Sequence, residues 1–149
     1  MRHVVQLTIW IALLTLCGCE VKVSVGDDNK PMGTFACAAL EDDTCAAPTD
    51  HFAPTVEVVH VVYRTKTLPK KDEVYTIRWI GEDVGQVAPP NTVIATLDEK
   101  VTDNPAVATS YSVHTHLTKP TAGWPVGKYR VEIERAGTIE TTARFSIAP

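Results

Sequence analysis

Short stretches of alternating or β-branched residues recur along the last two-thirds of the chain. They cover residues 56–66, 74–80, 92–97, 109–118, 129–134 and 139–147. A period of two residues is typical of β-strands, and Gly, Pro, Asn and Asp between the stretches mark turns. No stretch shows a convincing helical period. The pattern predicts an all-β fold, a β-sandwich of about seven strands.

The alternation also predicts which side chains form the core, because residues two apart in a strand point to the same face. One face of the stretch at 74–80 carries Tyr75, Ile77 and Trp79. The other expected inward residues are Tyr111, Val113, Thr115, Leu117, Tyr129, Val131, Ile133, Phe145 and Ile147. With 149 residues, of which 44% are hydrophobic, the chain can bury one such core.

The stretch GKYRV at residues 127–131 resembles the tyrosine corner of immunoglobulin-like domains. In that family a glycine, a tyrosine and a core residue begin the second-last strand, and Tyr129 and Val131 match the last two. The core residue is valine instead of cysteine, so the intersheet disulfide of antibody domains is missing. Trp79 matches the buried tryptophan of the middle strand. The resemblance implies an immunoglobulin-like sandwich over residues 55–149, similar to domains in bacterial lipoproteins of unassigned role.

The first 18 residues have the pattern of an export signal. A short positive start is followed by a mostly apolar run from Val4 to Leu16. A run of this length suits a signal core, whereas a membrane-spanning helix needs about 20 apolar residues. We therefore predict a signal peptide at residues 1–18, then a tether with a disulfide loop at 19–54, and the sandwich domain at 55–149.

The end of this run, Leu16-Cys17-Gly18-Cys19, resembles the lipobox of bacterial lipoproteins. Leu16 matches the branched apolar residue three before the obligate cysteine, and Gly18 matches the small residue before it. Cys17 departs from the usual small or hydroxyl residue. The resemblance implies cleavage before Cys19 and lipid attachment to its sulfur, which anchors the protein in the cell envelope. Because Glu20 follows instead of aspartate, we expect the outer membrane, with the domain facing the periplasm.

Cys37 and Cys45 remain as an even pair after the lipid cysteine. Because the envelope outside the cytoplasm is oxidising, we predict a disulfide between them. Such a short loop stabilises the fold by about 2–3 kcal/mol. The alternatives are two free thiols or a metal pair, although the spacing is not that of zinc knuckles.

The composition and motifs favour a non-catalytic binding protein. A formal net charge of −4, without a basic run, argues against nucleic-acid binding. The sequence contains no G-x-S-x-G elbow and no glycine-rich phosphate loop. We therefore predict no cofactor and no catalytic residue. The expected partner, besides the membrane, is another envelope protein that the domain binds or supports, or a periplasmic toxin that it neutralises.

The nearest approach to a metal site is His114-Thr115-His116. Two imidazoles on one face of a strand can bind one metal ion if His51 or His60 joins them from a neighbouring strand. The alternative is that both belong to a solvated outer face with Ser112 and its polar neighbours. Our first prediction assigns no metal; the second is a metal-binding or enzymatic lipoprotein that uses this histidine pair.

Two further features have alternative interpretations. The acidic run Glu41-Asp42-Asp43 lacks the alternating oxygen ligands and the glycine of a calcium loop, so we expect a solvated loop. Trp124 lies between glycine and proline, and we expect it to plug one end of the sandwich rather than to form an exposed interface.

Overall fold

A computed structural model describes residues 18–25, 29–102 and 108–149. The predicted signal peptide lies outside the described residues except for Gly18. Among the residues described, no helix is long and apolar enough to cross a membrane.

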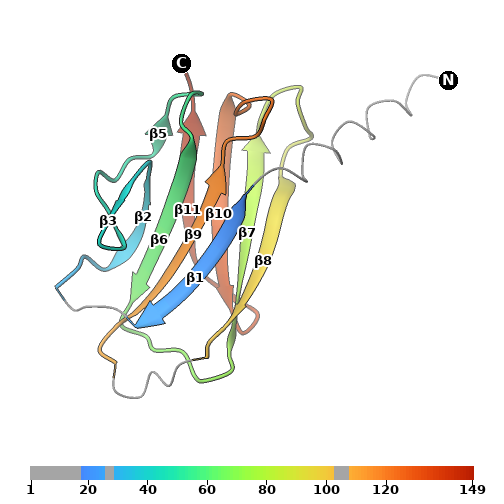
Figure 1. Cartoon of the computed structure of the whole chain (residues 1–149). Helices are drawn as coiled ribbons and strands as arrows, with labels where there is room; N and C mark the ends of the chain where they lie inside the picture. Colours follow the sequence, from blue (N-terminus) through green and yellow to red (C-terminus); the bar gives the residue numbers. More distant parts are fainter. Residues whose placement is uncertain (1–17, 26–28, 103–107) are drawn as a thin grey trace.

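The regular structure of the described residues consists of β-strands, and most of these form two packed sheets (Figure 1). The four-stranded sheet has the order β1-β9-β6-β2, and the five-stranded sheet has the order β5-β11-β10-β7-β8. A separate hairpin pairs β3 with β4. The strand bounds are β1 Cys19–Val25, β2 Gly33–Cys37, β3 Leu40–Glu41, β4 Thr44–Cys45, β5 His51–Phe52, β6 Val58–Thr65, β7 Val74–Asp83, β8 Thr92–Lys100, β9 Tyr111–Thr118, β10 Gly127–Arg135 and β11 Thr138–Ile147. The predicted all-β class is confirmed.

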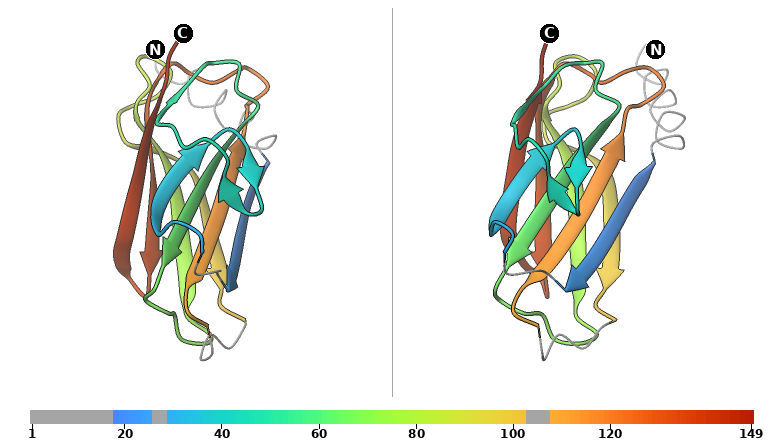
Figure 2. Two further views of the ribbon diagram at one scale, coloured as in Figure 1. Left: turned by 90° about the vertical axis from the view of Figure 1, so that its left-hand side faces the viewer. Right: turned by 60° about the vertical axis from the view of Figure 1, so that its left-hand side comes forward.

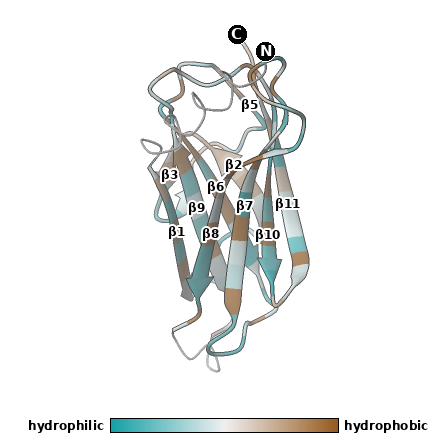
Figure 3. Cartoon of the chain, turned by 90° about the vertical axis from the view of Figure 1, so that its right-hand side faces the viewer, coloured by the Kyte–Doolittle hydropathy of each residue, from teal (hydrophilic) through white to brown (hydrophobic). Residues whose placement is uncertain are grey.

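The core lies between the two sheets and includes the side chains that alternation placed inward. Hydrophobic and hydrophilic residues are interspersed along the strands in Figure 3. Trp79 is 1% exposed, and its indole Nε1 donates a hydrogen bond to Thr115 Oγ1 at 3.1 Å. The other predicted inward residues are all buried: Tyr75, Ile77, Tyr111, Val113, Leu117, Tyr129, Val131, Ile133, Phe145 and Ile147.

The end of the sandwich near β10 is closed by two aromatic residues. The Tyr129 hydroxyl donates to the Pro125 carbonyl, four residues back along the chain, at 2.5 Å. Trp124 is buried and donates to the Val56 carbonyl at 2.7 Å. The plug expected of Trp124 is therefore confirmed. Gly127 has a φ of 156°, and a Cβ there would clash with the Asp83 backbone, so only glycine fits at this turn.

The sandwich begins well before residue 55, where the predicted domain boundary lay. β1 pairs with β9 from Cys19 onward, and β2 pairs with β6. The stretch that was expected to be a tether thus supplies both edge strands of the four-stranded sheet. The alternating residues EVKVSV lie in β1, whereas the five residues of β2 are too few to show a clear period.

The predicted disulfide between Cys37 and Cys45 is present and fixes the β3–β4 hairpin. Figure 2 shows this hairpin lying over β6, on the outer side of the four-stranded sheet. Cys37 is fully buried there and Cys45 nearly so, in a small second core with Val62. Phe35 and Leu40 pack against it. Part of the face expected to be solvated is therefore covered.

Candidate metal centre

Three histidines meet on the outer face of the four-stranded sheet, two from β9 and one from β6. His114 and His116 share a face because they are two residues apart. In the antiparallel register of β6 and β9, His60 lies directly opposite His116. All three are half-buried. The long-range pairing of β6 with β9 thus adds a third imidazole to the pair.

The three rings form a compact triangle. Their centroids lie 5.3 Å apart for His60 and His114, 5.5 Å for His60 and His116, and 5.9 Å for His114 and His116. One ring nitrogen from each histidine lies within 4.8 Å of the other two. Among the described residues this is the one group of three or more His, Cys, Asp or Glu side chains that is close enough to hold a metal ion.

The spacing suits a transition-metal ion after small ring rotations. Zn–N bonds of about 2.0–2.1 Å in tetrahedral geometry imply ligand nitrogens about 3.3 Å apart. His60 Nδ1 and His114 Nε2 already lie 3.1 Å apart, sharing a hydrogen bond. Three imidazole ligands are typical of Zn²⁺, Cu²⁺ and Ni²⁺ sites. A tetrahedral ion would keep a fourth position for a further ligand.

The surroundings favour the neutral imidazoles that a metal requires. Burial, followed by the neighbouring His60 and His116, lowers the pKa of His114 to about 4. Burial and the nearby His116 also lower the pKa of His60. A proton on His60 or His114 would lie in a half-buried site beside other imidazoles, so these two rings resist protonation. Metal ligation needs the unprotonated ring, so the lowered pKa values of His60 and His114 favour the binding of a cation.

Two acidic residues, one on β1 and one on the β3–β4 hairpin, lie near the cluster. Glu20 lies opposite His116 in the register of β1 and β9. Asp43 comes from the turn of the β3–β4 hairpin, and both carboxylates act to raise the pKa of His114. Neither was expected from the sequence, because no acidic residue neighbours His114 along the chain. Glu20 could have been found from the β1 pattern if its partner strand had been known.

The other histidine considered as a third ligand lies elsewhere. His51 belongs to β5 at the edge of the five-stranded sheet, is exposed, and shares a 2.5 Å hydrogen bond with Asp50. His60 is therefore the histidine that joins the pair. The expectation of a fully solvated face is also wrong at Ser112, which is only 5% exposed.

Cys19, the predicted lipid-attachment residue, is the first residue of β1 and is half-buried at one end of the sheet. It lies opposite Leu117, one residue from His116. Because Cys19 packs with Leu117 against the core between the sheets, it lies on the opposite face of the sheet from His116.

Comparison with known proteins reveals only distant likeness. No family model and no curated protein matches the chain. β-Glucosidase 3B from Thermotoga neapolitana, solved in complex with glycerol, is 13% identical with a TM-score of 0.42, over 90% of this chain and 16% of that one. The β-D-glucoside glucohydrolase from Trichoderma reesei is 14% identical with a TM-score of 0.37, over 89% and 19%. This chain spans less than a fifth of either enzyme.

Proposed function

We propose that this chain is a lipid-anchored, non-catalytic protein of the cell envelope whose sandwich binds one divalent transition-metal ion. The ligands are His60, His114 and His116. The observation that carries the proposal is the approach of their three ring nitrogens to within 4.8 Å. Three nitrogens on adjacent rigid strands provide a preorganised site, which lowers the ordering cost of binding.

The lipid anchor rests on the lipobox resemblance at residues 16–19, and the outer membrane on Glu20. The position of Cys19 at the start of β1 supports an attachment point at the end of the sandwich. An immunoglobulin-like assignment is supported by the Tyr129 hydrogen bond and the buried Trp79. Binding or supporting another envelope protein, or neutralising a toxin, stays a prediction from the sequence.

Zn²⁺ titration of the full-length protein, purified in detergent, tests the metal proposal. Isothermal calorimetry should give one site per chain, with His114→Ala weakening binding at least a hundredfold. His51→Ala is the matched control, because it removes an exposed histidine outside the cluster, and it should bind as the wild type does. Equal affinity of His114→Ala and wild type would overturn the proposal.

A separate experiment tests the anchor. Metabolic labelling with an alkyne fatty acid should tag the wild type and Cys17→Ala but not Cys19→Ala. Because the two cysteines are two residues apart, this pair controls for any general effect on export. Label retained in Cys19→Ala would disprove lipid attachment at that sulfur.

A further inference from the structure

The β3–β4 hairpin extends across the face that holds the histidines. Its base is fixed beside β6, because Cys37 lies opposite His60 in the β2–β6 register and bonds to Cys45. Val62, which packs against this disulfide, lies opposite His114 in the β6–β9 register. The base of the hairpin is therefore next to the histidine cluster.

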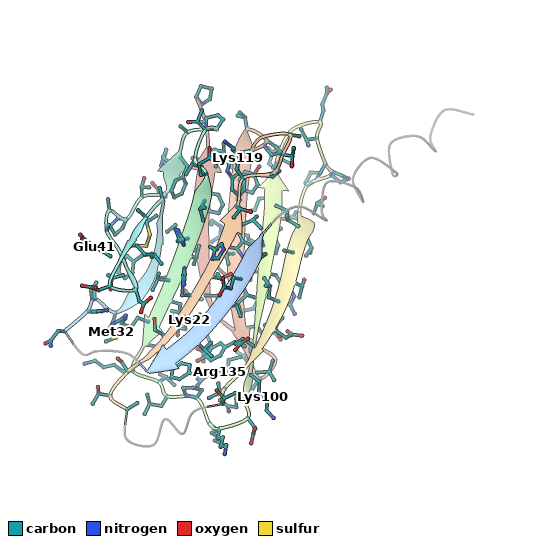
Figure 4. The ribbon with its side chains drawn as sticks, in the orientation of Figure 1. Lys22, Met32, Glu41, Lys100, Lys119 and Arg135 are labelled. Carbon is teal, nitrogen blue, oxygen red and sulfur yellow. A yellow bond between two sulfur atoms is a disulfide. The ribbon has the colours of Figure 1, made fainter. Side chains whose placement is uncertain are left out.

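The tip of the hairpin reaches the far side of the cluster. Asp42 and Asp43 turn the chain with φ values of 48° and 57°, and Asp43 Oδ1 lies 4.0 Å from Lys22 Nζ. Lys22 lies on β1 opposite His114. Figure 2 shows the hairpin over β6, and the contact with Lys22 brings the Asp43 carboxylate to β1, which pairs with the histidine strand β9. Figure 4 shows the disulfide in yellow near Glu41, with Lys22 labelled on β1.

We propose that Asp43 is the acidic residue of the metal centre and that the Cys37–Cys45 disulfide positions it there. This inference rests on the proposed metal-binding function. Three neutral imidazoles leave the full charge of a divalent ion uncompensated, and a carboxylate near a half-buried ion attracts it even though the Asp43 side chain is itself 63% exposed. When the ion binds, Asp43 exchanges Lys22 for the ion as its partner.

The disulfide is needed because a two-residue strand pair cannot hold its own position. An isolated hairpin is marginally stable in water, and β3 and β4 contribute two residues each. The covalent link and the small core around Val62 keep the turn over the sheet. In this scheme the disulfide affects metal affinity only by positioning Asp43. Removing the disulfide and the Asp43 carboxylate together should therefore weaken Zn²⁺ binding no more than removing either one alone.

The experiment uses full-length protein and Zn²⁺ alone, measured by calorimetry. Asp43→Asn should weaken binding about tenfold, as loss of an outer partner of a metal site does. Asp42→Asn is the matched control, since it removes the same charge one residue away, and asparagine tolerates the left-handed turn at both positions. We expect Asp42→Asn to stay within twofold of the wild type.

A double-mutant cycle tests the positioning role. Cys37→Ser/Cys45→Ser should weaken Zn²⁺ binding about as much as Asp43→Asn, and adding Asp43→Asn to it should change nothing further. Equal losses for Asp42→Asn and Asp43→Asn, or additive losses in the cycle, would overturn the inference. If the cysteine variant fails to fold, the Asp42 and Asp43 comparison decides alone. An absence of Zn²⁺ binding by the wild type would instead refute the proposed function.

Discussion

The outer faces of the two sheets hold their polar side chains in opposite ways. On the five-stranded sheet, opposite charges pair across strands, as in Arg78 with Glu134 at 2.6 Å. Arg130 bridges Glu132 at 2.8 Å and Glu82 at 3.3 Å. On the four-stranded sheet, three bases of the same kind face one another.

The two faces differ in whether their polar side chains are balanced by protein partners or leave room for a ligand. Arg78 and Arg130, with their glutamate partners, form an ion-pair ladder on the five-stranded sheet. Each arginine of this ladder has an acidic partner, so its charge is balanced without a ligand. Among the described residues of the four-stranded sheet, no acidic side chain balances the three imidazoles in this way, and only His60 and His114 share a hydrogen bond. If the proposed metal ion binds all three imidazoles, only the histidine face should respond to it.

The largest expected difference between the two faces is their response to Zn²⁺. At a free concentration a hundred times the dissociation constant, the ion should raise the free energy of unfolding by about 2.7 kcal/mol. Urea denaturation with and without Zn²⁺ measures the gain. His60→Ala should abolish it, whereas Arg78→Ala, on the other face, should keep it. A full gain in His60→Ala would remove the distinction between the faces.

Acid should weaken the metal-free protein through the histidine face. The pKa of His114 is lowered to about 4 in the folded chain, from about 6.5 when unfolded. The unfolded state therefore binds the proton more readily, and stability present above pH 6.5 is lost as the pH falls toward 4. Because the ring is partly exposed, we expect a loss of about 1–2 kcal/mol.

Urea denaturation of the metal-free protein at pH 7 and pH 4.5 measures this loss. His114→Gln should reduce the difference between the two pH values, while His51→Gln, which alters the exposed histidine of β5, should leave it as in the wild type. An unchanged difference in His114→Gln would show that other groups control the acid response.

The ion-pair ladder should contribute less to the free energy of unfolding than the histidine face does, and Zn²⁺ should not change that contribution. A double-mutant cycle on Arg78 and Glu134 should give a coupling of about 0.5 kcal/mol, the usual size for a partly exposed pair. Their side chains are 31% and 20% exposed. The coupling should shrink in high salt and be the same with and without Zn²⁺. A coupling that changed with Zn²⁺ would mean that the two faces communicate.

Glu20 should have the smallest effect. Glu20→Gln removes a carboxylate that lies opposite His116 and is exposed, as Asp43 is, but that no disulfide-linked turn holds beside the histidines. Its attraction for the ion should therefore be weaker and largely screened by solvent. We expect Zn²⁺ affinity to fall about twofold, or about 0.4 kcal/mol. Calorimetry compares Glu20→Gln with Glu99→Gln, which removes an acidic side chain from β8. A tenfold loss would identify Glu20 as a closer partner of the ion than Asp43.

Much of the fold could be read from local patterns, and the site only in part. The alternating stretches correctly predicted six strands of the two main sheets and, for four of them, the inward faces. The histidine pair was visible as residues two apart, but the third ligand stayed open between His51 and His60. The hairpin and Asp43 were missed, because two-residue strands carry no period and only the disulfide marked their place.

The sequence by itself determined the all-β class, the core side chains and the Cys37–Cys45 link, because each depends on short-range alternation or on cysteine chemistry. Only the tertiary structure decided that β6 and β9 are neighbours with His60 opposite His116. It also decided that the hairpin turns Asp43 toward β1. Strand pairing is set by packing between residues far apart in the chain, so the composition of the metal centre could not be obtained from any local stretch.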